Sequence, residues 1–171
     1  GKPLGFMNSG ALVTVAKETS QTAATVNATN VAKMWARQLN PMNSYWVMNP
    51  DVWPQLITMT IGNQPIWTPP QAGMTRAPGG FLLGRPIMAS DTHQTVGALG
   101  DISFVNWRAY AAITKASGIQ ADTSMHLWFD QNLNAFRFIF RIDGQPWLKA
   151  AVTPPNSSAT RSPFVVLAER S

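Results

Sequence analysis

The sequence contains no cysteine among its 171 residues. Disulfides, thiolate metal sites and thiol nucleophiles are therefore excluded together. No apolar run approaches the roughly 18 residues that a membrane-spanning helix needs, so we expect no membrane partner. No secretory signal peptide is evident, and the chain opens GKPLGF without an initiator methionine. We interpret it as a processed or truncated piece of a longer protein.

Charged residues are also scarce, at 12% of the sequence, where typical domains carry about 25%. Thr, Ser, Asn, Gln and Pro take their place, and seven Trp and eight Met are present. Because interface cores are depleted in charge and enriched in Trp, Met and Arg, this composition favours a surface built for protein–protein contact. The alternative is a soluble domain with an unusual surface.

The net charge of +5 and the pI near 10.1 predict non-specific attraction to polyanions. The basic residues are scattered and form no run of five or more, so a dedicated nucleic-acid-binding arm is not expected.

The order of apolar patterns indicates an α+β fold, with helices early and strands late. Apolar residues at helical spacing predict a helix over 27–39, with Asn27 or Thr29 as its cap. A second helix is expected to begin at Asn49. Strands are expected at 11–16, 45–49, 81–90, 101–105, 109–115, about 127–142, 147–152 and 164–169, a turn at Asp143–Gly144, and loops at 62–80 and 153–163.

The expected strand at about 127–142 alternates strictly from residue 136 onward. A period of two places successive side chains on opposite sides of a strand, so one face is predicted to lie in the core. The other face carries two arginines around an isoleucine and is either an interface or a solvated surface. The core face consists of Phe136, Phe138, Phe140 and Ile142, and the other face of Arg137, Ile139, Arg141 and Asp143.

No catalytic or cofactor motif is recognisable. His93 and His126 lack metal-ligand spacing and are interpreted as neutral loop or surface residues. The chain has no GxSxG elbow. A Ser–His–Asp triad built from distant positions around either histidine stays open. We predict that the chain is not an enzyme and holds no cofactor or metal.

Four segments in order carry a family resemblance. They are LLGRPIMASD (82–91), GDISFVNWRAYAAI (100–113), WFDQNLNAFRFIFRIDGQP (128–146) and SPFVVLAE (162–169), preceded by YWVMNPDVWPQL. Together they resemble a tailed-bacteriophage major capsid protein of the Hong Kong 97 type. The resemblance implies a structural subunit that tiles an icosahedral shell.

The resemblance also implies a domain arrangement. Residues 1–125 would form mainly the axial domain, in which helices flank a central sheet, and residues 126–171 mainly strands of the peripheral domain. The family's N-terminal arm, extended loop and spine helix would precede this chain. The loop at 62–80 would point toward a symmetry axis or the shell surface.

Candidate contact residues follow from the resemblance. Arg137 and Arg141 would meet acidic or carbonyl groups of elements that this chain lacks, and Trp67 and Trp147 are further subunit-contact candidates. The type member cross-links its subunits through an Asn that matches Asn132. The helper position, an acid there, is Ile139 here, so we expect no cross-link.

The implied partners are other copies of the chain in hexamers and pentamers, packaged DNA held by non-specific electrostatics, and a scaffold and protease. The implied location is the virion capsid, assembled in the host cytoplasm. Alternatives left open are a nanocompartment shell of the same fold, a basic nucleic-acid-binding module and a hydrolase with an unrecognised triad.

Overall fold

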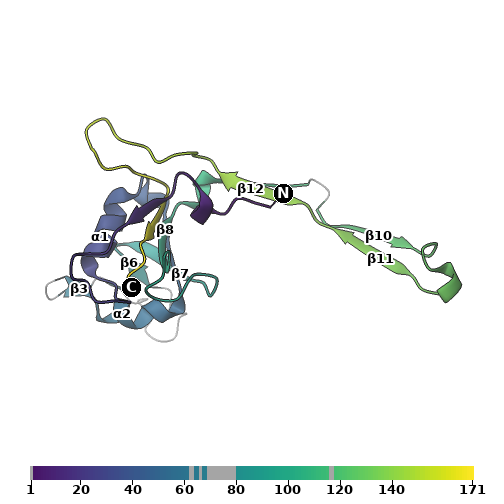
Figure 1. Cartoon of the computed structure of the whole chain (residues 1–171), viewed down its shortest axis with the longest axis horizontal. Coiled ribbons are helices and arrows are strands. Elements are labelled where there is room, and N and C mark those ends of the chain that lie inside the picture. Colours follow the sequence, from purple (N-terminus) through teal and green to yellow (C-terminus); the bar gives the residue numbers. More distant parts are fainter. Residues whose placement is uncertain (1, 62–63, 66, 69–79, 116–117) are drawn as a thin grey trace.

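The computed structural model describes residues 2–61, 64–65, 67–68, 80–115 and 118–171. Two parts are distinct in Figure 1: a body built on a sheet with helices beside it, and a long narrow arm that leaves the body.

The body is organised by a seven-stranded mixed sheet. β1 pairs parallel with β13, and β2 pairs parallel with β7, whereas the other neighbours are antiparallel. A mixed sheet accompanied by a few helices confirms the α+β class. Their order across the sheet is β1 (Val13–Val15), β13 (Phe164–Leu167), β8 (Ile102–Val105), β2 (Tyr45–Met48), β7 (Arg85–Ala89), β6 (Phe81–Leu82) and β5 (Trp67–Thr68).

The helices begin at the predicted caps. Asn27 precedes α1 (Ala28–Arg37), and its backbone N–H donates to the Asn30 side chain at 3.0 Å. The Asn49 side chain accepts from the Asp51 N–H at 3.0 Å and starts a 3₁₀ turn that leads into α2 (Trp53–Thr58). Val31, Met34 and Leu56 are fully buried, so both helices turn an apolar stripe inward.

The core is centred on aromatic side chains of the sheet. Phe104 stacks between Trp46 and Trp35, with ring centroids 4.1 and 5.4 Å away. The indole N–H of Trp46 donates to the Leu82 carbonyl at 2.9 Å, which satisfies the buried donor. β2, β8 and β6 are thereby joined through side chains as well as through the sheet.

The arm is an antiparallel ribbon in two paired stretches. β9 (Tyr110–Thr114) pairs with β12 (Ile142–Pro146) next to the body, and β10 (Gln120–Ser124) pairs with β11 (Ala135–Ile139) farther out. A 3₁₀ turn at Phe129–Gln131 lies in the tip. Figure 1 shows this ribbon extending away from the sheet.

The chain's first residues run beside the base of the arm. The Leu4 N–H donates to the Gly144 carbonyl at 2.8 Å, and the Tyr110 hydroxyl donates to the Leu4 carbonyl at 3.1 Å. A Cβ at Gly144 would lie 2.8 Å from the Tyr110 ring, so a larger residue here would require the ring to shift.

Short elements complete the described chain. β3 (Thr60–Ile61) pairs with β4 (Gln64–Pro65), and 3₁₀ turns occur at Phe6–Asn8, Pro41–Asn43 and Trp107–Ala109. The expected loop at 62–80 is therefore interrupted by β4 and β5. Residues 62–63, 66 and 69–79 of that loop lie outside the described residues.

Three predictions of local structure near the arm are wrong. The strand expected at about 127–142 is divided between β11 and the start of β12. Asp143 and Gly144 pair with β9 inside β12 and form no turn there. Residues 147–152 contain no strand, and only Val152 bridges, to Arg161.

The expected domain boundary after residue 125 falls between β10 and β11, two strands that pair with each other. Within the expected second part, residues 126–171, β13 lies in the body's sheet between β1 and β8. The structure has two parts, the arm, residues 110–146, and a body made from the residues on both sides of it in the sequence.

Candidate assembly surface

The arm carries large apolar side chains that nothing in the described chain covers. Phe136 and Phe138 are 68% and 71% exposed, and Phe140 and Ile142 are about half exposed. The prediction that these four residues form a core is wrong. The alternation was correct for β11, but the ribbon has no second layer within the described residues, so both of its faces remain open.

Pairing across the ribbon explains why the two phenylalanines stand free. Phe136 lies opposite Thr123, and Phe138 lies opposite Ala121. Residues directly opposite in an antiparallel pair share a face, so each ring has only a small neighbour. The face that carries the two phenylalanines is therefore an apolar surface that a single ribbon cannot bury.

The opposite face of the ribbon holds an ion pair. Arg137 Nη2 donates to Asp122 Oδ2 at 2.8 Å, and both side chains are more than half exposed. Arg137 therefore meets an acid of its own chain, whereas the resemblance implies acidic or carbonyl groups of elements that this chain lacks. Arg141 is also exposed, and it lies in the short gap between β11 and β12.

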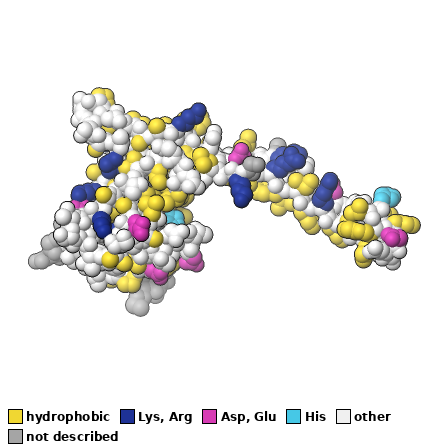
Figure 2. All heavy atoms as spheres, in the orientation of Figure 1, with side chains coloured by type: hydrophobic (Ala, Val, Ile, Leu, Met, Phe, Trp, Pro, Cys, Tyr) yellow, Lys and Arg dark blue, Asp and Glu magenta, His cyan; other side chains and the backbone are white. Residues whose placement is uncertain are grey.

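The tip adds further exposed apolar residues. Figure 2 shows hydrophobic side chains along the arm and gathered at its end. Asn132 lies here, exposed, with a φ of 52° in the left-handed region that asparagine tolerates better than most residues. The exposed apolar side chains of the tip are Met125, Leu127, Trp128, Phe129 and Leu133.

Charge is distributed unevenly between the arm and the body. The arm has three basic residues and three acidic ones, which cancel, so the net charge of +5 belongs to the rest of the chain. An electrically neutral, apolar arm suits contact with protein better than contact with a polyanion. The charged residues of the arm are Lys115, Arg137, Arg141, Asp122, Asp130 and Asp143.

Trp147 lies at the base of the arm, where the chain re-enters the body. Its backbone N–H donates to the Ala109 carbonyl at 2.8 Å, and its side chain is 77% exposed. Trp67 belongs to β5 and pairs with Leu82, but its side chain lies outside what the structure describes. The four candidate contact residues are thus not brought together: two are on the arm, one at its base and one at the edge of the sheet.

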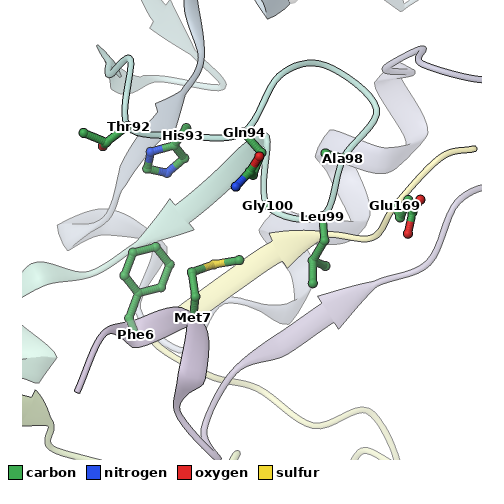
Figure 3. A pocket seen from close by; sticks show the side chains of 9 residues that line it. All are labelled: Phe6, Met7, Thr92, His93, Gln94, Ala98, Leu99, Gly100 and Glu169. Atoms are coloured by element: carbon green, nitrogen blue, oxygen red, sulfur yellow. The ribbon is translucent and has the colours of Figure 1, made fainter.

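A hollow of about 580 Å³ lies on the body beside His93 (Figure 3). The His93 ring faces Phe6, with centroids 6.5 Å apart, and its Nε2 is 3.2 Å from Ser103 Oγ. Partial burial lowers the pKa of the His93 imidazole, and the Asp101 carboxylate opposes this shift. His93 is therefore a neutral, half-buried loop residue near neutral pH.

Ser103, His93 and Asp101 do not make a hydrolytic triad. The Ser103 side chain is fully buried in β8, so a substrate carbonyl cannot reach its hydroxyl. The Asp101 carboxylate accepts from the N–H groups of Gly97 and Ile102 and from Arg170. The Asp101 carboxylate is thus hydrogen-bonded to these partners and does not orient the His93 imidazole. The other histidine, His126, is exposed in the arm tip.

The described residues contain no cluster of three or more metal-ligating side chains. Among the helices that the structure describes, none has the length and apolar character needed to traverse a bilayer.

Sequence reasoning missed two hollows at the arm base. Trp147 and Arg108 line one of them. Arg108 also lines the other, together with Tyr45, Met88 and Trp107, which come from three different strands or turns. The dipeptide Trp107–Arg108, which Ala109 separates from β9, was the available signal, because Trp and Arg are enriched at interface centres.

Comparison with known proteins agrees with the resemblance seen in the sequence. The model of the phage capsid family matches residues 1–157. A solved structure, the capsid of an empty GTA particle computed with C5 symmetry, has a TM-score of 0.62 and 15% sequence identity, and the match covers 99% of this chain and 54% of that chain. At this identity the likeness shows the fold alone, and this chain spans about half the length of that one. No curated protein matches. The chain belongs to the phage capsid family.

Proposed function

We propose that this chain is part of the structural subunit of a tailed-phage or prophage shell that assembles from copies of itself into pentamers and hexamers. The observation that carries the proposal is the arm, a projecting ribbon whose phenylalanines are uncovered. Large exposed apolar patches mark interaction sites in folded proteins.

The energetics favour a covering partner for the arm. An isolated two-stranded ribbon is at best marginally stable in water. Each phenylalanine that a partner covers gains about 1.5–3 kcal/mol from burial. The covering layer is a neighbouring copy or a further segment of the full-length protein. Contacts of this kind need only modest area because many of them close one shell.

The two parts of the fold suggest two roles. We assign the body to the axial domain, which meets its copies around the symmetry axes, and residues 110–146 to the peripheral domain. β13 returns to the body's sheet, so it goes with the axial part. This assignment replaces the boundary at residue 125 that the sequence suggested.

Further partners belong to the same proposal. The positive charge of the body would attract packaged DNA without reading its bases, through counterion release. A scaffold, a maturation protease and assembly in the host cytoplasm would accompany a shell of this type. The role is structural, and no reaction is assigned to the chain.

Electron microscopy of the full-length protein tests the proposal. Wild-type protein is expected to form closed particles of uniform diameter. The double variant Phe136→Asp/Phe138→Asp should fail to form them, because charge on this face prevents its burial. The matched variant Phe136→Leu/Phe138→Leu keeps the face apolar and should still assemble.

The results also separate the alternatives. Particles that enclose protein cargo and no DNA would favour a nanocompartment. Monomers with strong DNA retention on filters at low salt, lost at high salt, would favour the basic binding module. Particles formed equally well by the aspartate variant would overturn the role of the arm.

A further inference from the structure

Two hollows of about 760 and 520 Å³ adjoin each other at the base of the arm, and both are lined by Asn43 and Arg108. Trp147 lines one hollow, and Tyr45, Met88 and Trp107 line the other. We call these six residues and the hollows that they line the base groove.

The chemistry of the base groove is aromatic with a single cation. Trp107, Trp147, Tyr45 and Met88 are each about 40% exposed or more. Arg108 is exposed, and within the described residues its guanidinium has neither an ion pair nor a hydrogen bond. Neither hollow has an acidic residue in its lining. Trp, Tyr and Arg in desolvated pockets are the side chains that dominate interface energies.

The arm tip has the complementary character. Residues 125–134 carry exposed Trp128 and Phe129, and next to them Asp130 is the only acidic residue of the tip, which has no Lys or Arg. We propose that the tip of the arm of one copy docks in the base groove of a second copy, with Trp128 and Phe129 in the two hollows and Asp130 against Arg108. This rests on the proposed function and names the partner of its arm.

The geometry requires two copies. Each limb of the arm contains two strands of five residues. The tip of the arm therefore lies on the order of 30 Å from the groove at the base of the arm. Figure 1 shows the tip at the far end of the molecule from the body. A tip on one surface and a groove on another make a head-to-tail contact, and contacts of this type close into rings or continue from subunit to subunit.

This chain has no cysteine, so introduced cysteines test the contact once any cysteine elsewhere in the full-length protein has been replaced by serine. Full-length protein carrying Asn43→Cys is mixed with full-length protein carrying Gln131→Cys, assembled, oxidised and analysed on denaturing gels. A linked dimer is expected from this mixture. The control mixture pairs Asn43→Cys with Ser158→Cys, which lies in an exposed loop outside the tip, and should give no dimer.

Charge exchange gives a second, independent readout. Arg108→Asp and Asp130→Arg should each lower the yield of particles about tenfold, as expected for loss of a close ion pair. The double variant, in which the two charges are exchanged, should regain most of that yield.

The outcomes distinguish the two proposals. Particles that form without the Asn43–Gln131 link, or with the control link equally strong, would overturn the docking of the tip while leaving the shell function intact. A double variant no better than either single variant would also overturn it. Wild-type protein that forms no particles under any condition would overturn the shell function, and the docking with it.

Discussion

Arg170 and Asp101 form an ion pair from which water is completely excluded. Neither side chain has any exposed surface. Arg170 also donates to the carbonyls of Thr25 and Ala168, and the Asp101 carboxylate accepts two backbone N–H groups. The pair joins the segment that follows β13 to the residue that precedes β8. The ion pair therefore links β13 and β8 in addition to the backbone hydrogen bonds between these two strands.

Removing one member of this pair is expected to be costly. Asp101→Asn leaves the Arg170 guanidinium buried beside a neutral amide, which should lower the free energy of unfolding by about 3–5 kcal/mol. Urea unfolding followed by tryptophan fluorescence measures this loss.

The exposed pair in the arm provides the control for that experiment. Asp122→Asn removes the same charge from an ion pair in water and should cost less than about 1 kcal/mol. Equal losses for the two variants would show that burial of the Arg170–Asp101 pair has no energetic importance.

Phe104 and Phe138 provide a second matched comparison. Phe104 is fully buried between two indoles, so Phe104→Ala should cost about 3–5 kcal/mol in the free energy of unfolding. Phe138 is largely exposed on the arm, and Phe138→Ala should change it by no more than about 0.5 kcal/mol. Urea unfolding of the unassembled chain gives both values. A large loss for Phe138→Ala would mean that the free chain already buries this face.

His93 should make stability depend on pH. Burial lowers its pKa in the folded protein below the usual value of about 6.5. The unfolded chain therefore binds the proton more readily, and the stability that His93 contributes is present above about pH 6.5 and lost as the pH falls through the folded pKa. A single group changes the free energy of unfolding by at most about 1.4 kcal/mol per pH unit.

Unfolding midpoints at pH 7.5 and 5.5 check this prediction. The difference between the two midpoints should be smaller in His93→Gln than in wild type. Gln131→Ala, a change of an exposed, non-titrating residue in the arm tip, should leave the difference unaltered. If His93→Gln keeps the full pH dependence, the acid sensitivity arises from other groups.

The arginines of the arm remain candidates for subunit contact. Arg137 already has Asp122 as a partner, and Arg141 has no ion pair within the described residues. Arg137→Glu/Arg141→Glu is expected to lower particle yield, since it replaces two positive charges on the arm with negative ones, and Arg141→Glu alone should account for most of the loss. Electron microscopy and sedimentation measure the yield. Assembly unaffected by the double change would remove both residues from the interface.

Local patterns in the sequence predicted the body well. Asn27 and Asn49 begin their helices as expected, and the apolar runs at 45–49, 101–105 and 164–169 are strands of the central sheet. Each of these signals depends on residues close together in the chain, which is why it could be recognised. The pairing of β1 with β13 depends on residues far apart, and no local pattern indicates it.

The arm shows where the same reasoning fails. The alternation around Phe138 reports that one side of a strand is apolar, but it contains no information on what covers that side. Here the described chain covers neither face. Asp143–Gly144 resembles a turn, yet β9 pairs with it and keeps it extended. The base groove escaped prediction because Tyr45, Met88 and Trp147 converge only in the folded chain.

The position of β13 has a consequence for synthesis of the protein. β13 is made after every other strand of the sheet, yet it lies between β1 and β8. Until β13 has emerged, β1 has no partner in the sheet and β8 has a bare edge. The body can close only when residues 164–167 have emerged. A prematurely terminated chain would thus keep an open sheet, and quality-control proteases could remove it before it joins its neighbours.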